Sequence, residues 1–454
     1  MRHLTPGILQ KVTGGEVRGN LPAAEITAIS TDSRTVVPGG LFAAIPGQTV
    51  DGHDYIPMAA DKGASCVLCS RFSETDIPQI RVEDTLTALR EIAAFYRCQF
   101  DIPFVGITGS VGKTTAKEMI GAVLAACFNT LRTEKNFNNE LGVPLTLFRL
   151  REEHEAAVVE MGISDFGEMT RLTEMVHPDI AVFTLIGDAH LEFLGDHSGV
   201  LRAKSEIVSG MPDDGVVIAN GDDDTMRGHD FGRKTVWFGL GDDCGVRAAE
   251  IENEGTSAVT CVIEAGERRI PVRIPAFGRH MVYAALMGAA VGLELGLSDE
   301  EIAAGIAAFE TVGSRGRILN TGSITILDDC HNANPTSTAS SLDTLSSMPG
   351  RHVAILGDML ELGERGPMLH RETGRKAAAS AELVLACGTV SRAIADGAGD
   401  RALWYPDTDS LIKALPDHIR PGDTILVKAS HAMGFDAVVE SLENHSFSQD
   451  SPEQ

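Results

Sequence analysis

The sequence lacks several features that would place it in other classes of protein. None of its apolar runs approaches the roughly 20 residues that a membrane-spanning helix needs, and residues 1–6 contain no apolar core of a signal peptide. Positive charge is also scarce, because 38 Lys and Arg residues stand against 64 Asp and Glu residues, a net charge of −26. This balance argues against nucleic acid or an anionic membrane as the main partner. A small anionic ligand needs only a local basic pocket and is not excluded.

Cysteine is sparse as well, with eight residues scattered through a chain of 454. Most of them lie in apolar segments, which predicts reduced core thiols and a cytoplasmic protein. The pair Cys66 and Cys69 forms a lone C-x-x-C in an alternating apolar run. Positions three apart face opposite sides of a strand, so we do not expect a zinc or redox site there.

The length predicts about three domains, and the 43% hydrophobic content is enough for sizeable cores. We expect an α/β protein with a small β-rich N-terminal domain over 1–83, a parallel-sheet domain over 84–312 and a second doubly wound, Rossmann-like domain over 313–454. Segment 313–316 is a plausible linker, and the polar tail 446–454 is expected to be disordered. Short apolar runs typical of buried parallel strands support the two larger domains; they lie at 102–105, 157–159, 180–183, 216–218, 324–327, 353–356, 383–386 and 425–427.

A glycine-rich loop follows the first of these expected strands. The run Gly106-Ile107-Thr108-Gly109-Ser110-Val111-Gly112-Lys113-Thr114-Thr115 precedes a helical pattern with Met119, Ile120, Val123, Leu124 and Cys127 on one face. Small residues let backbone N–H groups approach phosphate oxygens, and a helix N-terminus adds a favourable dipole. We expect Lys113 to reach the β- and γ-phosphates and Thr114 to ligate Mg²⁺. Gly106 lies one residue too early for the strict phosphate-loop spacing.

Three ionisable residues follow other expected strands or lie on a helix. Glu160 ends an apolar strand and is well placed for Mg²⁺, although a solvated strand-end glutamate has the same pattern. His190 follows the strand at 180–183, where a histidine that serves only its loop is equally compatible with the sequence. Lys204 lies in a helical stretch, and its own context favours a solvated surface lysine.

Two further polar clusters admit more than one interpretation. Residues 328–334 close a strand of the third unit, where aspartates could hold ribose hydroxyls and asparagines could serve a turn before Pro335. In the first unit, Arg34 could pair with a diphosphate, but a lone arginine is usually structural.

Taken together, these segments resemble the Mur ligase family, and the resemblance covers nearly the whole chain. The motifs that carry it are the phosphate loop 108–114, Asn136-Phe137-Asn138-Asn139-Glu140-Leu141-Gly142-Val143-Pro144, Glu160-Met161-Gly162, Ala189-His190-Leu191-Glu192, Ala203-Lys204-Ser205-Glu206-Ile207, Asp329-Cys330-His331-Asn332-Ala333-Asn334-Pro335 and Leu356-Gly357-Asp358-Met359-Leu360-Glu361-Leu362-Gly363.

The resemblance implies a three-domain, ATP-dependent amide ligase. The first domain would hold the UDP end of a UDP-N-acetylmuramoyl tripeptide, the second would bind ATP, and the third would close over the site. ATP would phosphorylate the terminal carboxylate of the tripeptide, and the amine of D-alanyl-D-alanine would attack the acyl phosphate. The cofactors would be ATP and two Mg²⁺ ions, and the enzyme would act as a monomer.

The family's functional positions map onto this chain as follows. Lys204 matches a lysine that is carbamylated in these enzymes, which would turn a cation into an anion able to support a hard metal. The metal set would therefore be Thr114, Glu160, His190 and Lys204, and the catalytic set would add Lys113. The implied ATP contacts are Thr108, Gly109, Ser110, Val111, Gly112, Lys113, Thr114, Thr115, His280, Arg317, Asp329 and Asn332. The implied substrate contacts are Ser30, Asp32, Ser33, Arg34, His53, Asn138, Asn139, Asn334, Lys428 and Ser430.

The chain departs from the family pattern at five positions, one of which is Ala429 in place of the glycine of a Lys-Gly-Ser-Arg pattern. Met281 and Ala284 stand where asparagines usually lie near the adenine, His331 replaces a tyrosine, and His431 replaces an arginine of a Lys-Gly-Ser-Arg pattern. Alternatives therefore stay open: a related ligase with diaminopimelate, lysine or glutamate as acceptor, including a folate-polyglutamate enzyme, or a non-catalytic nucleotide-binding switch.

Overall fold

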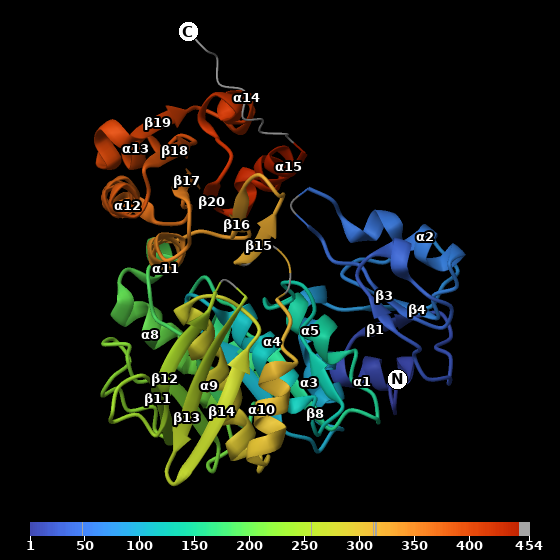
Figure 1. Cartoon of the computed structure of the whole chain (residues 1–454). Coiled ribbons are helices and arrows are strands. Elements are labelled where there is room, and N and C mark those ends of the chain that lie inside the picture. Colours follow the sequence, from blue (N-terminus) through green and yellow to red (C-terminus); the bar gives the residue numbers. More distant parts are fainter. Residues whose placement is uncertain (48, 256, 312, 314–315, 445–454) are drawn as a thin grey trace.

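The computed structural model describes residues 1–444 except 48, 256, 312 and 314–315. It contains three β-sheets with helices around them, and these form three lobes (Figure 1). The expected α/β organisation in three sheet-containing units is confirmed, whereas the boundaries at 83/84 and 312/313 stay predictions. The expected linker lies partly outside the described residues, and the expected disordered tail lies entirely outside them.

The first sheet has the strand order β1-β5-β4-β3-β2, and only β1 is antiparallel to its neighbour. Its strands are β1 (Glu16–Arg18), β2 (Ile29–Ser30), β3 (Leu41–Ala43), β4 (Cys66–Cys69) and β5 (Gln79–Arg81). The accompanying helices are α1 (Pro6–Thr13), η1 (Ser33–Thr35), η2 (Gly52–Tyr55), α2 (Ile56–Asp61) and α3 (Thr85–Arg97). All eight cysteines of the chain are free and six are buried, so the expectation of mostly core thiols is confirmed.

The second sheet has nine strands in the order β14-β13-β12-β11-β10-β9-β6-β8-β7. It is parallel from β7 to β12, and β12, β13 and β14 form an antiparallel meander. The strands are β6 (Phe104–Thr108), β7 (Thr130–Arg132), β8 (Ala156–Glu160), β9 (Ile180–Phe183), β10 (Val216–Asn220), β11 (Lys234–Gly239), β12 (Val246–Glu254), β13 (Ala258–Ala265) and β14 (Arg268–Ile274). Because β7 and β8 lie on one side of β6 and β9 lies on the other, the strand order reverses at β6. Open α/β sheets bind ligands at the carboxyl ends of the strands at such a point.

Helices cover both faces of this sheet. They are α4 (Lys113–Leu124), α5 (Gly142–Leu147), α6 (Glu168–Val176), α7 (Leu191–Leu194), α8 (His197–Ser205), η3 (Glu206–Gly210), α9 (Arg279–Glu294) and α10 (Asp299–Ala307). Ser298 caps α10 in a capping box with Glu301, as its position before the helix predicts. One expectation is wrong: Cys127 does not continue the buried face of α4, because the helix ends at Leu124 and Cys127 is exposed.

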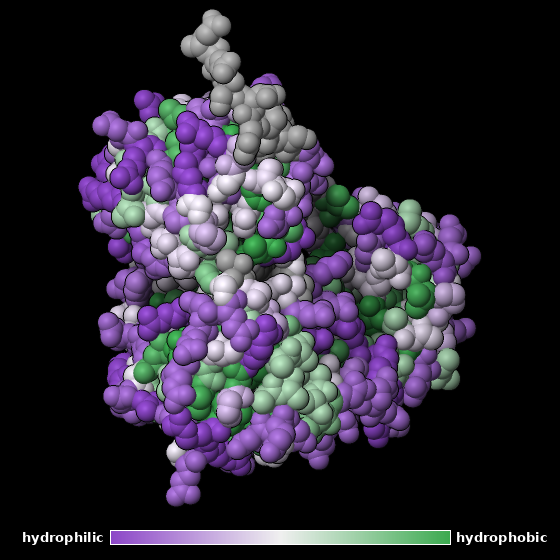
Figure 2. Space-filling view, viewed as in Figure 1, coloured by the Kyte–Doolittle hydropathy of each residue, from purple (hydrophilic) through white to green (hydrophobic). Residues whose placement is uncertain are grey.

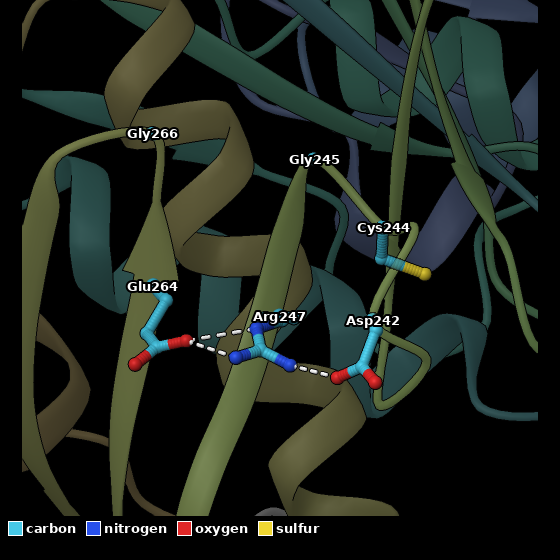
Figure 3. A pocket seen from close by; sticks show the side chains of 6 residues that line it. All are labelled: Asp242, Cys244, Gly245, Arg247, Glu264 and Gly266. Carbon is cyan, nitrogen blue, oxygen red and sulfur yellow. Dashed lines mark hydrogen bonds and ion pairs between the residues drawn. The ribbon is translucent and has the colours of Figure 1, made fainter.

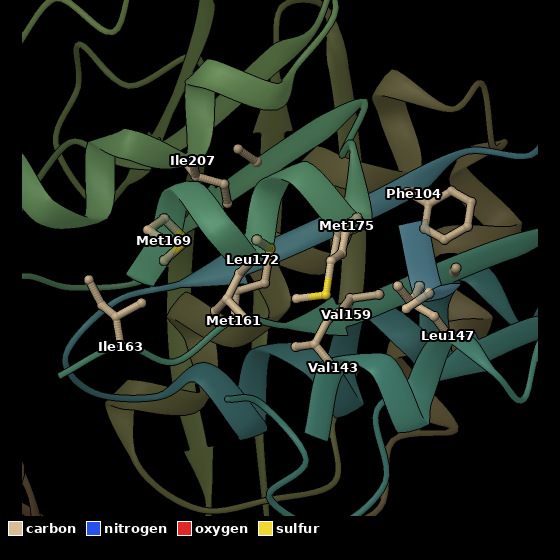
Figure 4. Close-up of a cluster of buried hydrophobic side chains, with 14 of the residues drawn as sticks. Phe104, Val143, Leu147, Val159, Met161, Ile163, Met169, Leu172, Met175 and Ile207 are labelled. Carbon is tan, nitrogen blue, oxygen red and sulfur yellow. The ribbon is translucent and has the colours of Figure 1, made fainter. Parts of the chain in front are cut away.

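Apolar side chains between β6, β8 and the surrounding helices form a continuous core (Figure 4). Val159 and Met161, on either side of Glu160, are fully buried in it together with Val143 of α5 and Leu172 of α6. Burying an aliphatic side chain of this size contributes about 1.5–3 kcal/mol. The backbone that carries Glu160 is therefore held rigidly from both sides.

The third sheet has the order β15-β16-β20-β17-β18-β19, with an antiparallel β15–β16 hairpin and parallel pairing elsewhere. Its strands are β15 (Arg317–Asn320), β16 (Thr325–Asp328), β17 (Arg351–Gly357), β18 (Leu383–Cys387), β19 (Ala402–Tyr405) and β20 (Asp423–Lys428). Its helices are α11 (Pro335–Ser346), η4 (Gly363–Arg365), α12 (Gly366–Ser380), α13 (Arg392–Ala398), η5 (Gly399–Arg401), α14 (Thr408–His418), η6 (His431–Met433) and α15 (Asp436–Asn444).

The third lobe lies above the second in the view of Figure 1, with α11 facing the second lobe, and the first lobe lies to the right. The same face in Figure 2 is dominated by hydrophilic residues and is hollowed between the upper and right-hand lobes. No helix among the described residues is long and apolar enough to cross a membrane.

Candidate active site

The phosphate loop connects β6 to α4 at the point where the strand order reverses. Gly112 is the N-cap of α4 with φ 82°, and Gly109 has φ 142°, both in the region that favours glycine. A Cβ at Gly109 would overlap Oγ1 of Thr184, so the loop is also sterically closed to larger residues. Lys113 donates from Nζ to the Gly109 carbonyl at 2.7 Å. This geometry presents the N-terminus of α4 and a lysine to an anion.

Gly106 does not fit the phosphate-loop spacing, and the structure gives it a different role. It lies inside β6, where a Cβ would approach Sδ of Met161 to 2.9 Å and a carbon of Ile207 to 3.2 Å. Close packing between the strand and its neighbours therefore accounts for this glycine. Of the remaining loop residues, Thr108 ends β6, Ser110 and Val111 lie in the turn, and Thr115 lies in the first turn of α4.

Glu160 lies at the end of β8, next to the phosphate loop. Its side chain is buried, and Oε2 accepts a hydrogen bond from Oγ1 of Thr114 at 2.8 Å while Oε1 accepts one from Nδ2 of Asn138 at 2.8 Å. Adjacent hydroxyl and carboxylate oxygens are the ligands that Mg²⁺ prefers. The two residues expected to share one ion are therefore in direct contact.

Asn139 has a different role from Asn138 in this structure. Its Oδ1 accepts hydrogen bonds from the backbone N–H groups of Leu141 and Gly142, at 3.2 and 2.9 Å. These bonds fix the turn that leads into α5. Only Asn138 of the pair extends to the Glu160 carboxylate.

Lys204 lies on α8 and is buried, with a side chain 1% exposed. Loss of water around the amine, followed by the nearby charge of Lys113, lowers its pKa well below 10.5, and Glu168 opposes this effect. No hydrogen bond or ion pair among the described residues involves its Nζ. The expectation from the sequence context alone, a solvated surface lysine, is wrong, because the turn between α7 and α8 folds this helix face inward.

His190 precedes α7 and belongs to the same group of charges. Burial, and then the positive charges of Lys204 and Lys113, lower its pKa to about 4, and Glu168 acts in the opposite direction. The imidazole is therefore neutral near pH 7, as a metal ligand must be. The structure thus brings Lys113, His190 and Lys204 close enough for their charges to interact, and Glu168, which the sequence analysis missed, acts on both His190 and Lys204.

The candidate residues of the first lobe lie in the turn after β2 and in η2. Asp32 accepts hydrogen bonds from the Arg34 guanidinium at 2.7–3.1 Å, and this interaction lowers the pKa of Asp32 to about 2. The hydroxyl of Ser30 accepts from the Asp32 N–H at 3.0 Å, and that of Ser33 lies 3.3 Å from Sδ of Met58.

His53 is engaged within the first lobe through both of its nitrogens. Nδ1 lies 2.7 Å from Asp51, and Nε2 accepts from the Ser70 N–H at 2.9 Å. Among the described residues, no hydrogen bond or ion pair links His53 or the 30–35 turn to the phosphate loop. The structure therefore places these residues together in the first lobe and does not join them to the phosphate loop.

The candidate residues of the third lobe surround the turn after β16. Lys428, at the end of β20, is buried and donates to Oδ2 of Asp329 at 2.6 Å and to the Asn332 carbonyl at 2.9 Å. Asn334 caps α11 in a capping box, and Oγ of Ser430 accepts from the Leu360 N–H at 3.0 Å. Lys428 and the two asparagines thus shape the turn that points toward the second lobe.

Two nucleotide candidates lie near the linker. Arg317, in β15, has an NH2 nitrogen 3.6 Å from the buried carboxylate of Asp328. His280, in the first turn of α9, is exposed, and a Cβ at Gly316 would lie 3.9 Å from its Nε2.

Met281 and Ala284, by contrast, are buried in the core beneath α9, so their apolar character is explained by packing. His331 and His431 lie with ring centroids 5.5 Å apart.

A pocket elsewhere on the second lobe does not belong to this group. Arg247 of β12 is held between Asp242 and Glu264, with Cys244 beside them (Figure 3). The guanidinium is satisfied by these two carboxylates. The pair of Arg247 with Glu264 links β12 to β13. Because both carboxylates engage the guanidinium, the pocket presents no free cation to an anionic ligand.

Three descriptions of Mur ligase domains match segments of this chain. The descriptions that match are the Mur ligase middle domain over 107–292, the Mur ligase, glutamate ligase domain over 310–431 and the Mur ligase family, catalytic domain over 25–97. The chain is 36% identical to the UDP-N-acetylmuramoyl-tripeptide–D-alanyl-D-alanine ligase of Escherichia coli strain K12, over 94% of this chain and 97% of the relative. It is 33% identical to the enzyme of the same name from Bacillus subtilis strain 168, over 97% and 98% of the two chains.

Solved structures give the same result. A crystal structure of MurF from Acinetobacter baumannii is 30% identical, with a TM-score of 0.91 over 97% of this chain and 99% of that chain. MurF ligase from Thermotoga maritima in complex with ADP is 27% identical, with a TM-score of 0.83 over 92% and 97%. Folylpolyglutamate synthase from Mycobacterium tuberculosis, complexed with ADP and AMPPCP, is 15% identical with a TM-score of 0.63 over 80% and 95%, which shows a shared fold alone.

Proposed function

Because this chain belongs to the Mur ligase family, we propose that it is the ATP-dependent ligase that joins D-alanyl-D-alanine to UDP-N-acetylmuramoyl tripeptide. Relatives that match nearly the full length carry this activity in their names, and a similar structure is a complex with ADP. The observation that carries the proposal is the contact of Thr114 with Glu160 beside the phosphate loop, with Lys204 buried nearby.

In this proposal the phosphate loop binds the triphosphate of ATP. The backbone N–H groups at the start of α4 and the Lys113 ammonium neutralise charge that develops as the γ-phosphoryl group moves to the tripeptide carboxylate. The chain offers oxygen and nitrogen donors for two Mg²⁺ ions, namely Thr114 and Glu160 for one, and His190 and modified Lys204 for the other. These ions would supply further charge neutralisation when bound.

Carbamylation of Lys204 is a chemical requirement of this arrangement. A neutral amine attacks CO₂, forms an N–C bond and releases one proton, which leaves a carbamate anion. Burial lowers the pKa of Lys204 and therefore increases the fraction of neutral amine at neutral pH. The product would place an anion near Lys113 and the metal, where a buried ammonium would repel both of these positive charges.

The first-lobe residues Ser30, Asp32, Ser33, Arg34 and His53 are proposed to contact the UDP end of the tripeptide substrate. Arg34 is the most exposed member of the set, so its guanidinium can exchange Asp32 for a diphosphate without loss of a core contact. From the third lobe, Asn334, Lys428 and Ser430 are proposed to act on substrate, while His280, Arg317, Asp329 and Asn332 are proposed to act on ATP. The free thiols favour a cytoplasmic location, and we propose a monomer.

The direct test is phosphate release with UDP-N-acetylmuramoyl tripeptide, ATP and Mg²⁺, with D-alanyl-D-alanine, diaminopimelate, lysine and glutamate compared as acceptors. We expect turnover with the dipeptide alone. Turnover only with L-glutamate would contradict the proposed acceptor, and no turnover with any acceptor despite ATP binding would favour a nucleotide-binding switch.

Lys204 gives a second, independent test. Lys204→Ala should lose at least about 100-fold in turnover because the metal-supporting anion is absent, and short carboxylic acids such as acetate should restore part of it. Lys11→Ala, which removes an exposed lysine of α1, is the control and should retain normal turnover. Full turnover of Lys204→Ala without added acid would contradict the carbamate.

A further inference from the structure

A carboxylate of the third lobe contacts His190 of the second lobe. Oε2 of Glu361, in the loop between β17 and η4, lies 2.7 Å from Nδ1 of His190. Nδ1 is buried and makes no aligned hydrogen bond among the described residues. Hydrogen bonds of functional groups are often poorly aligned before ligands bind.

Both partners of this contact adopt a backbone conformation that non-glycine residues rarely use. His190 has φ 54° and Glu361 has φ 62°. Such positions cost about 1–3 kcal/mol each and persist where the surrounding structure holds them. Two of them facing each other across the junction of two lobes indicate a contact that the fold maintains against local preference.

The loop that carries Glu361 is held firmly against the second lobe. Its neighbours Met359 and Leu362 are buried in the same apolar cluster as Leu191 and Leu194 of α7. The Leu360 N–H donates to Oγ of Ser430 at 3.0 Å. The loop therefore has little freedom to withdraw the carboxylate while the lobes are in contact.

We propose that Glu361 is a positioning residue that accepts the Nδ1 hydrogen of His190 and so leaves Nε2 as the nitrogen that binds a metal. A metal-ligating histidine generally donates its other N–H to a carboxylate or carbonyl, which sets the tautomer and the orientation of the ring. Here that partner comes from a different lobe. The inference rests on the proposed role of His190 as a metal ligand.

This arrangement couples contact between the lobes to the second metal position. When the third lobe is docked, Glu361 orients His190; when it is away, the ring loses that partner. The charges of Lys113, Lys204 and Glu168 also act on His190, so the ring that Glu361 contacts belongs to the same group of charged residues as the phosphate-loop lysine.

The test is Mn²⁺ binding to the full-length protein saturated with ADP, measured by electron paramagnetic resonance. Glu361→Gly removes the carboxylate, and glycine adopts this backbone conformation without strain. We expect it to weaken one of two bound Mn²⁺ ions about 10- to 100-fold and to leave the other unchanged. Glu361→Gln retains an acceptor oxygen and should bind both ions nearly as the unaltered protein does.

Glu364→Gln is the matched control, because Glu364 is exposed and lies three residues further along the chain, in η4; it should bind Mn²⁺ normally. His190→Ala separates the two hypotheses. If His190→Ala weakens one ion and Glu361→Gly does not, the positioning role is wrong and the metal role of His190 survives. If His190→Ala changes neither ion, the proposed metal role is wrong and the positioning role falls with it.

Discussion

At the scale of single residues, burial decides the chemistry of the two groups that the sequence left most open. Lys204 and His190 have ordinary neighbours in the sequence, yet both are surrounded by protein and lie within the influence of Lys113 and Glu168. Glu168 and Glu361 were not singled out in the sequence analysis, because residues close to them in the chain do not reveal their contacts. Glu361 lay inside a quoted motif, and its significance depends on a contact with a residue 171 positions away.

The lowered pKa of His190 makes a prediction about pH. Its pKa is about 4 in the folded protein and about 6.5 in an unfolded chain, so the unfolded state binds more protons between these values. Stability therefore falls as pH drops from 6.5 toward 4, by at most about 2 kcal/mol between pH 6.5 and 5. Scanning calorimetry of the metal-free proteins should show a smaller fall in melting temperature from pH 6.5 to 5 for His190→Asn than for the unaltered protein. Parallel pH profiles for the two proteins would contradict the assignment.

At the scale of elements, three segments converge on Glu140. Its carboxylate pairs with Arg90 of α3 and with Arg171 of α6, and it lies in the loop that carries Asn138 toward Glu160. The motif 136–144 is thus held by helices far from it in sequence.

Edge elements were harder to predict: β19 was missed because it has no continuous buried run, with Leu403 and Trp404 both exposed.

The Glu140 pairs predict a combined effect on stability and turnover. Glu140→Gln leaves two guanidinium groups facing each other without their anion, which should lower the free energy of unfolding by about 2 kcal/mol and reduce turnover because Asn138 loses its fixed position. Glu152→Gln removes the exposed partner of Arg2 and should change stability by less than about 0.5 kcal/mol. Urea unfolding and phosphate release measure both effects; equal behaviour of the two variants would contradict the prediction.

At the scale of the whole molecule, the segment after β9 connects two lobes. Ser110 and Gly187 exchange hydrogen bonds at 3.1 and 3.0 Å, and Thr336 of α11 lies against Gly187 and Asp188. A Cβ at Gly187 would lie 2.6 Å from Oγ1 of Thr336. The segment therefore contacts the phosphate loop on one side and the third lobe on the other.

This close approach predicts the effect of a larger side chain at position 187. Gly187→Ala should separate α11 from the second lobe, raise the radius of gyration in small-angle X-ray scattering and lower turnover. Gly187→Ala combined with Thr336→Ala removes the clashing hydroxyl and should restore most of both properties. If the double variant is no more compact than the single one, contact with α11 is not what limits the arrangement of the lobes.

The sequence by itself determined the α/β class, the alternation of strands and helices and the phosphate loop, because these depend on periodicity and on residues adjacent in the chain. It also carried the family resemblance, which depends on short motifs. Only the tertiary structure decided which charges meet: that Thr114 and Asn138 share Glu160, that Lys204 is buried, that His53 serves its own lobe and that Glu361 faces His190. Electrostatic interaction and burial depend on distance in space, and the reversal of strand order at β6 and the docking of the third lobe set those distances.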